Sequence, residues 1–130
     1  MKKITILLLL VAAVGLGAAA SRKGLYENLK VLPKDISSKD LQGIMTDDFE
    51  DGLGVSCEFC HANNKDGNGL DFASDAKPEK GIARKMMKMT LDLNKEYFKV
   101  HKPKLGSNAL VITCTTCHKG QPFPDGDTLQ

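Results

Sequence analysis

Two five-residue motifs contain all four cysteines of the chain and two of its three histidines. They are Cys57-Glu58-Phe59-Cys60-His61 and Cys114-Thr115-Thr116-Cys117-His118. Residues three and four apart share one face of a helical turn, so each motif presents two thiols and an imidazole together. This C-x-x-C-H pattern is typical of covalent haem attachment: the thiols form thioethers with the haem vinyl groups, and the imidazole takes an axial position on the iron. We therefore predict two covalently bound haem c groups. The predicted thioether residues are Cys57, Cys60, Cys114 and Cys117, and the predicted proximal iron ligands are His61 and His118.

Paired cysteines also take part in other chemistry, which the sequence leaves open. Two C-x-x-C pairs can hold a structural zinc ion, and in an exported protein they can form disulfides or act as a thiol–disulfide catalyst. None of these uses requires a histidine directly after the second cysteine, yet both motifs have one, at His61 and His118. The repeated histidine favours haem over zinc and over redox-active thiols.

The N-terminus has the composition of a targeting segment. A short basic stretch, Met1-Lys2-Lys3, precedes an apolar run from Ile4 to Ala20, which ends in three alanines before Ser21. This order is typical of a signal peptide with an A-x-A cleavage site. As a helix the run would span about 25 Å, at the short end of what a membrane anchor needs. We predict that residues 1–20 are a signal peptide or an N-terminal membrane anchor, and that residues 21–130 form one domain in the periplasm or otherwise outside the cytoplasm.

The composition of residues 21–130 limits what the domain can bind. Without Lys2 and Lys3 the chain has 16 basic and 16 acidic residues, and no basic stripe suggests nucleic acid. No second apolar run has membrane length, so membrane contact would depend on the N-terminal run. Tryptophan is absent and aromatic residues are few, which leaves a thin apolar core. We expect two large apolar cofactors to complete the interior, and folding to depend on them.

A first helix is predicted from Ser37 to Gly52. Ser37 and Asp40 have capping-box spacing, and the apolar face that follows is made of Leu41, Ile44, Met45 and Phe49. The glycines at 52 and 54 predict a reversal, and Met45 lies 12 residues before Cys57, enough for its sulfur to reach the haem face opposite His61. Met45 is therefore a candidate distal iron ligand, although a lone methionine on an apolar face is more commonly a packing residue.

A polar loop and a long helix are predicted between the two motifs. Residues 62–76 are rich in glycine and polar residues; within them, residues 64–75 partly match a calcium-binding EF-hand loop, but a solvated turn is the better interpretation. Pro78 fits the first turn of a helix that we expect to continue to about Val100. The buried stripe expected for this helix, at i+3 and i+4 steps, is Ile82, Met86, Met89, Leu93, Tyr97 and Val100. Met87, Leu91 and Phe98 are expected to widen it, so that the helix packs on two sides.

The order of these elements repeats along the chain. A methionine-bearing helix, a reversal and a C-x-x-C-H turn occur twice, with 28 residues from Met86 to Cys114 in the longer second unit. We predict a mainly α fold, a small dihaem cytochrome c domain built from this pseudo-repeat with long loops. The repeat suggests one axial methionine for each haem.

Four segments and two prolines together resemble a known family. They are residues 28–33, 73–77, 83–90 and 114–120, followed by Pro122 and Pro124. In this order they resemble the cytochrome c subunit of photosynthetic reaction centres, specifically one two-haem half of it, over most of residues 25–124. The larger members of that family carry four haems, whereas this chain has two attachment motifs.

The resemblance implies roles for further residues. Met45 corresponds to the axial methionine on the family's first helix, and Met86, directly after Arg84-Lys85, takes the position of the axial methionine for the second haem. Met89 would then be a packing residue, although spacing alone does not separate it from Met86. His101 lies next to the position where larger members supply a histidine to a haem of their other half. It is either a bystander or a ligand to a haem, including one in a neighbouring chain.

The leading functional prediction is an exported carrier, not an enzyme, that moves single electrons between respiratory redox proteins. Partner docking would be weak and electrostatic, through surface lysines such as Lys85, Lys88 and Lys119. One alternative is a dihaem peroxidase or gas-binding protein with an open iron, for which His101 is the only free histidine that could act as an acid or base. A second alternative is a module that stacks head to tail into a chain of haems.

Overall fold

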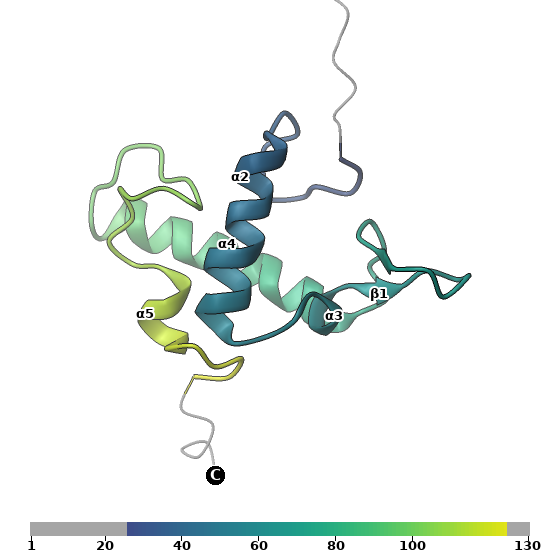
Figure 1. Ribbon diagram of the computed structural model, residues 1–130. Coiled ribbons are helices and arrows are strands. Elements are labelled where there is room, and N and C mark those ends of the chain that lie inside the picture. The colour runs from purple at the N-terminus through teal and green to yellow at the C-terminus, as the bar shows by residue number, and fades with distance from the viewer. Residues whose placement is uncertain (1–25, 125–130) are drawn as a thin grey trace, which may run out of the picture.

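The computed structural model describes residues 26–124, and the predicted signal peptide or anchor at residues 1–20 lies outside them. The described chain is mainly helical (Figure 1), which confirms the predicted class. Its helical elements are α2 (Ser38–Gly43), the π-helix η2 (Ile44–Asp51), α3 (Cys57–Cys60), α4 (Pro78–Glu96) and α5 (Cys114–His118). Two short strands, β1 (Ala62–Asn63) and β2 (Leu70–Asp71), complete the described elements. Between residues 26 and 124, no helix combines the length and the hydrophobicity that crossing a membrane requires.

The first helix begins where its capping residue predicts, but it changes character after one and a half turns. The Ser37 side chain accepts a hydrogen bond from the backbone N–H of Asp40 at 3.1 Å, which satisfies one of the free donors at the helix start. From Ile44 the helix continues as η2, with the wider π-type winding that often occurs at functional sites. At the junction, the Thr46 hydroxyl lies 3.1 Å from the Gln42 carbonyl and 3.3 Å from the Gly43 carbonyl, and it donates to these acceptors as the winding changes. The predicted single α-helix from Ser37 to Gly52 is therefore an α-helix joined to a π-helix.

The long helix α4 starts at the predicted proline and ends earlier than predicted. Pro78 occupies its first turn, where a missing N–H costs nothing. The helix ends at Glu96 rather than near Val100. Beyond it, Lys99 has a left-handed backbone (φ 55°), and the Val100 N–H turns back to the Asn94 carbonyl at 3.0 Å. This turn carries the chain away from the helix axis before Pro103 is reached.

The predicted buried stripe of α4 is wrong at most of its positions, whereas Met87, which was expected to widen the stripe, is buried. The buried residues of the helix are Lys80, Met87, Thr90 and Asn94. Three residues of the predicted stripe, Ile82, Met86 and Met89, are 54%, 41% and 46% exposed. They line a hollow that is described below. A helical period of apolar residues therefore does not distinguish a face that lines a binding site from a face that packs in the core.

The predicted loop at residues 62–76 contains a β-hairpin. Strands β1 and β2 pair antiparallel, with Ala62 opposite Asp71, and they are too short to produce a visible alternation in the sequence. The Asn64 N–H donates to the Gly69 carbonyl at 2.9 Å and closes the turn, while the predicted twelfth calcium position, Asp75, pairs instead with Lys30 and Arg84. Within residues 26–124, no group of three or more histidine, cysteine or acidic side chains is arranged to hold a metal ion. These contacts favour the solvated-turn interpretation over an EF-hand.

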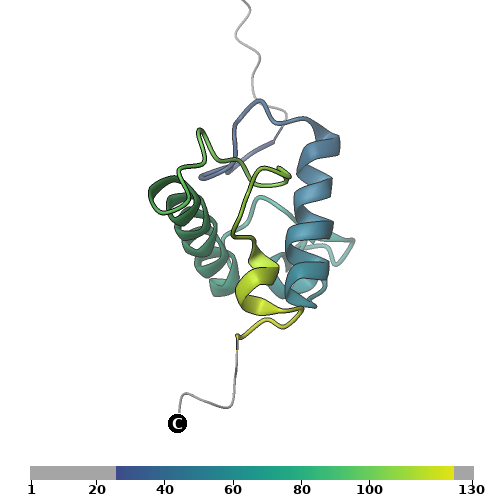
Figure 2. The same ribbon diagram turned by 90° about the vertical axis from the view of Figure 1, so that its left-hand side faces the viewer.

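The core is small and lies between the two long helical segments. Its buried apolar residues are Ile44, Met87 and Leu105, and half-buried side chains pack against them: Val31, Leu32, Ile36, Phe49, Leu91 and Leu110. Figure 2 shows α2 and η2 on one side, α4 on the other, and α5 between their lower ends. The thin core agrees with the composition of the chain.

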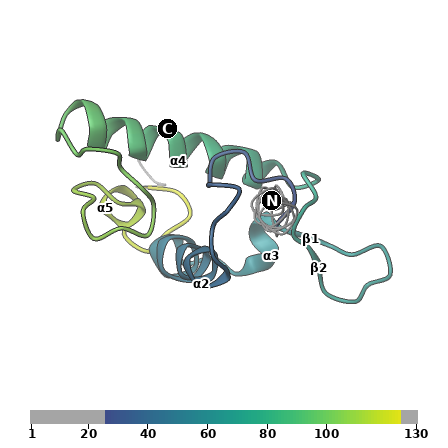
Figure 3. The same cartoon turned by 90° about the horizontal axis from the view of Figure 1, so that it is seen from above.

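Helices α3 and α5, which contain the two C-x-x-C-H motifs, lie near different ends of α4, and glycines in the neighbouring turns bring them into contact. Seen from above, α3 lies beside the N-terminal end of α4, and α5 lies toward its C-terminal half (Figure 3). The turn before α3 contacts the turn after α5, because the Gly120 N–H donates to the Gly52 carbonyl at 3.1 Å. The fold thus holds the two motifs apart along one helix and links them through close backbone contacts between these turns.

Candidate functional site

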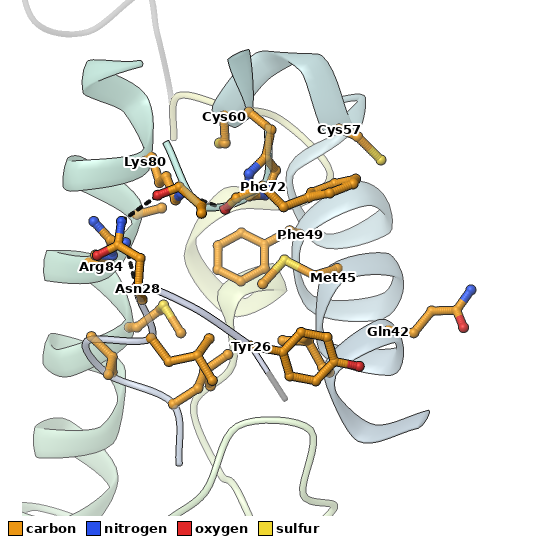
Figure 4. A pocket seen from close by; sticks show the side chains of 18 of the residues that line it. Tyr26, Asn28, Gln42, Met45, Phe49, Cys57, Cys60, Phe72, Lys80 and Arg84 are labelled. Carbon is orange, nitrogen blue, oxygen red and sulfur yellow. Dashed lines mark hydrogen bonds between the residues drawn. The ribbon is translucent and has the colours of Figure 1, made fainter. Parts of the chain in front are cut away.

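The first C-x-x-C-H motif opens onto a large cavity. Its volume is about 730 Å³, within the range of about 300–1,000 Å³ that is usual for ligand pockets. The cavity is lined by the N-terminal arm (residues 26–32), α2, η2, α3 and α4. Its wall contains His61 together with Met45, Cys57 and Cys60, which are labelled in Figure 4. Met45 and Phe49 enter it from η2, while Lys80 and Arg84 enter from α4 on the opposite side. The structure therefore brings together the predicted thioether cysteines, the predicted proximal histidine and the predicted distal methionine of the first site.

His61 is held in a form that suits an iron ligand. Its ring meets Phe72 edge to face, with the ring centroids 4.9 Å apart. Its Nδ1 atom is buried and has no hydrogen-bond partner among the residues that the structure describes. Burial lowers the pKa of His61, and the positive charges of Lys80 and Arg84 lower this pKa further. The imidazole is thus kept neutral at physiological pH, as metal ligation requires.

A network of charges closes one side of this cavity. Lys80 is almost buried, and its ammonium group donates to the Phe72 carbonyl at 2.7 Å and to the Ser74 carbonyl at 2.6 Å. Arg84 donates to Asp75 at 2.7 Å and to the Asn28 carbonyl at 3.0 Å, across 56 residues of sequence. Lys30 of the N-terminal arm also pairs with Asp75, at 2.6 Å. The network ties the arm to α4 over the cavity. This charge network was not predicted from the sequence. The signal that the sequence offers is the spacing of Lys80 and Arg84, two cations four residues apart on α4 with no other charged residue between them.

Because the charge network is centred on Asp75, the contact between the N-terminal arm and α4 should weaken in acid. Hydrogen bonds from Lys30 and from Arg84 hold the pKa of Asp75 well below its ordinary value of 3.8. Asp75 therefore binds a proton less tightly in the folded protein than in the unfolded chain, so its ionised carboxylate stabilises the fold. This stabilisation is complete above the pKa that Asp75 has in the unfolded chain, and it is lost as the pH falls through the pKa that Asp75 has in the folded protein. Asp75→Asn is expected to have a lower thermal midpoint than the parent at about pH 7, and the gap is expected to shrink as the pH is lowered toward about 2.

The effect should be small, because the Asp75 side chain is 43% exposed and water screens its pairs. Asp92→Asn, at an exposed position on α4, is the control and should show no such pH-dependent gap. A constant gap between Asp75→Asn and the parent at every pH would contradict the assignment.

The second motif borders a smaller hollow. Its volume is about 100 Å³, and its wall contains Cys114, Cys117 and His118 of α5 together with Met86 and Met89 of α4. Three side chains of this wall are also partly exposed at the surface: Met86, Met89 and Phe123, the last of which is 65% exposed. Met86 and Met89 line the same hollow as His118, so the structure, like the sequence, leaves either one as the candidate ligand.

His118 has the hydrogen bond that orients an axial ligand. Its Nδ1 lies 2.9 Å from the Gln121 carbonyl, so Nδ1 carries the proton and Nε2 is left free to bind a metal. The local sequence builds this turn: Thr113 and Thr116 form a reciprocal capping box at the start of α5, and Lys119 ends the helix with a left-handed backbone (φ 53°). Gln121 is a functional residue that the sequence analysis did not single out, since a backbone carbonyl leaves no signature in the sequence.

The two hollows share a wall. Phe49, Cys60, Ala83 and Met87 line both of them. Phe49 and Met87 are apolar side chains that pack against the small core from η2 and α4. The two sites are thus separated by a thin layer of side chains and no intervening element.

One cysteine of each motif is poorly suited to acting as a reactive thiolate. All four cysteines are free thiols in this structure. Burial raises the pKa of Cys60 and, chiefly by the same cause, raises the pKa of Cys114 to about 11. The thiols of Cys60 and Cys114 therefore stay protonated at neutral pH, which disfavours the redox-thiol alternative.

His101 lies apart from both sites. It is exposed, in the irregular segment after α4, and is not among the described residues that line either hollow. This position gives His101 no contact with the proposed iron sites within the chain.

The residues at both sites fit a covalently attached haem. Each site combines two thiols, a histidine, at least one methionine from another helix and a mostly apolar wall. A haem bound there supplies a one-electron couple between ferrous and ferric iron. This combination on a small helical domain defines a c-type cytochrome.

The comparisons with known proteins agree with this class. Residues 12–127 match the family described as the photosynthetic reaction centre cytochrome C subunit, and the chain belongs to that family. It is 34% identical over 87 residues to cytochrome c-554 of Chloroflexus aurantiacus, which covers 67% of this chain and 19% of that protein. It is 34% identical over 68 residues to the photosynthetic reaction center cytochrome c subunit of Rubrivivax gelatinosus, covering 52% of this chain and 15% of that protein.

A third relative, the photosynthetic reaction center cytochrome c subunit of Roseobacter denitrificans, is 29% identical over 114 residues, covering 83% of this chain and 28% of that protein. The matched regions thus amount to less than a third of the length of these relatives. No solved structure matches the chain. The predicted family is confirmed, and membership in a cytochrome c family implies covalently bound haem c.

Proposed function

We propose that this chain is a two-haem electron carrier that works outside the cytoplasm and passes single electrons between respiratory redox proteins. The observation that carries the proposal is the pair of C-x-x-C-H sites, each facing a methionine, on hollows that share one wall. Haems in the two hollows would share the wall that contains Phe49 and Met87, which supports electron exchange within the domain. The pseudo-repeat of methionine-bearing helix and attachment turn is part of this proposal.

In the proposed carrier, Met45 and Met86 are the distal ligands, opposite His61 and His118. Two protein ligands leave no open position on an iron, which suits electron transfer and excludes substrate. A thioether ligand favours the ferrous state relative to a second imidazole, so both sites would have raised potentials. The charges of Lys80 and Arg84 beside the first site act in the same direction there.

The surroundings of the sites favour a carrier over the peroxidase or gas-binding alternative. That alternative needs an acid–base side chain beside an open iron, and His101 lies outside both hollows in the described structure. Partners would be redox proteins that dock at the exposed edges of the hollows. The names of the relatives connect two of them with photosynthetic reaction centres, but this chain matches only a small part of each, and the proposed partners are respiratory.

Replacing Met86 and Met89 separately tests the proposal at the second site. Met86→Leu is expected to remove one of two histidine–methionine signals from the near-infrared magnetic circular dichroism spectrum of the ferric protein, because leucine has no donor atom. Met89→Leu, at a similarly exposed position on the same hollow, is the matched control and is expected to keep both signals. Leucine replaces methionine at little cost in packing, so both variants should fold.

The reverse result, loss of the signal in Met89→Leu alone, would move the ligand to Met89 and keep the carrier. Peroxide turnover by the parent protein, undiminished in Met86→Leu, would overturn the carrier in favour of the enzyme.

A further inference from the structure

Asn94 stands out because it is a wholly buried polar residue on a helix that faces a binding site. It is 0% exposed and lies on α4, eight residues after Met86, or about 12 Å farther along the helix axis. Neither the motifs nor the comparisons assign it a role. A buried carboxamide must have its hydrogen-bonding groups satisfied, so its partners show what it holds in place.

The carboxamide of Asn94 uses its full capacity of two acceptor and two donor positions. Its Oδ1 accepts from the N–H groups of Val111 at 2.7 Å and Ile112 at 3.1 Å. Its Nδ2 donates to the carbonyls of Ile112 at 2.7 Å and Thr90 at 2.9 Å. Three of the four bonds therefore go to the two residues that lead into the second attachment motif.

These bonds replace secondary structure at a place that has none. Residues 109–113 belong to no helix or strand, and Val111 is 55% exposed. Asn94 pairs with both the N–H and the carbonyl of Ile112, as a neighbouring strand would. Ile112 and Thr90 also line the second hollow, so the pairing lies directly behind that site.

We infer that Asn94 is a positioning residue for the second haem site: it fixes the distance between α4, which carries the methionine ligand, and α5, which carries Cys114, Cys117 and His118. The inference rests on the proposed function of that site. The residues of α5 would attach the haem from one face, and the spacing that Asn94 sets decides whether a methionine of α4 reaches the other face.

Asparagine is the residue type that this role needs. Leucine has the same number of side-chain heavy atoms, branched at the same position, but no polar group, and it would leave the N–H groups of Val111 and Ile112 without their acceptor. Aspartate keeps the shape and the acceptors, but when ionised it has no donor for the Thr90 and Ile112 carbonyls. When protonated, it regains one donor. This difference gives a test in which the pH alone restores the contact.

The test uses Asn94→Leu and Asn94→Asp in the haem-loaded protein, with near-infrared magnetic circular dichroism and redox titration as readouts. Asn94→Leu is expected to lose one of two histidine–methionine signals and to lower the potential of that haem, while the other haem is unchanged. Asn94→Asp is expected to show the same loss at neutral pH and to recover the signal on acidification. Asn108→Asp, the same change at an exposed position, is the control and should match the parent at every pH.

Retention of both signals in Asn94→Leu and Asn94→Asp would overturn the inference. So would equal loss of both signals, since that pattern belongs to general destabilisation. A parent protein without a histidine–methionine signal from the second site would instead overturn the proposed function.

Hydrogen exchange in the parent protein tests the same contact if the variants do not fold. The amides of Val111 and Ile112 are expected to exchange at least about tenfold more slowly than the exposed amide of Asn108. Exchange of all three at the same rate would overturn the inference.

Discussion

Replacing Met45 with leucine is expected to leave the first of the two haem irons without its distal ligand. Leucine fills a similar volume at a cost below about 1.5 kcal/mol, so the variant should fold and attach haem. It offers no donor atom, and Lys80, which also lines this cavity, has its ammonium group engaged by two carbonyls. One histidine–methionine signal should disappear from the near-infrared magnetic circular dichroism spectrum, with a high-spin ferric signal in its place. The reduced variant should bind carbon monoxide at one haem of two.

Met87→Leu provides the matched control for this result. Met87 is 6% exposed, lines the same cavity and belongs to the core, so its replacement should change stability slightly and leave both signals in place. If Met45→Leu also kept both signals, Met45 would be a packing residue and the ligand would have to come from another side chain.

The second large effect is expected from Gly54→Ala, at a position that lines neither hollow. Gly54 has a left-handed backbone (φ 63°), which costs a residue with a Cβ about 1–2 kcal/mol. A Cβ at this position would also overlap the carbonyl oxygen of Gly120, which is backbone and cannot move aside alone. We expect a loss of about 3–5 kcal/mol in the free energy of unfolding, measured by denaturant titration of the haem-loaded protein. Since the contact joins the turn before α3 to the turn after α5, both haem signals should change together.

Gly67→Ala separates the two causes of this loss. Gly67 has a similar left-handed backbone (φ 76°), but a Cβ there would have no neighbour within 4 Å. Its replacement should cost only the backbone strain, about 1–2 kcal/mol, and leave the haem signals unchanged. Equal losses in the two variants would show that the contact between Gly54 and Gly120 contributes nothing to the fold.

Features that depend on a few neighbouring residues could be predicted from the sequence. Ser37 caps α2 and Pro78 opens α4 because capping and proline geometry act within one turn. The motif spacing likewise predicted the helical turns α3 and α5. The helical period also predicted that Met45 lies on the apolar face of the first helix, and the glycines after it predicted a reversal toward the first motif. In the structure, Met45 lines the cavity beside that motif.

Features that depend on distant contacts could not be predicted in this way. The early end of α4 and the role of Asn94 depend on segments 6 and 18 residues away, and the bond from Arg84 to Asn28 spans 56 residues. The exposed stripe of α4 shows a different limit. A helical period of apolar residues indicates that one face of the helix is shielded from water. The period is the same whether that face packs against protein or against a cofactor. The predicted buried stripe therefore includes Ile82, Met86 and Met89, although all three are partly exposed and line the second hollow.

The near-infrared magnetic circular dichroism spectrum of the ferric parent protein, produced in a host that attaches haem c, tests the central claim most directly. It reports the axial ligands of each iron. The proposed carrier predicts two low-spin histidine–methionine haems and no high-spin component. A bis-histidine signal would contradict the assigned ligands and direct attention to His101, and a high-spin signal would show an open iron and contradict the carrier itself.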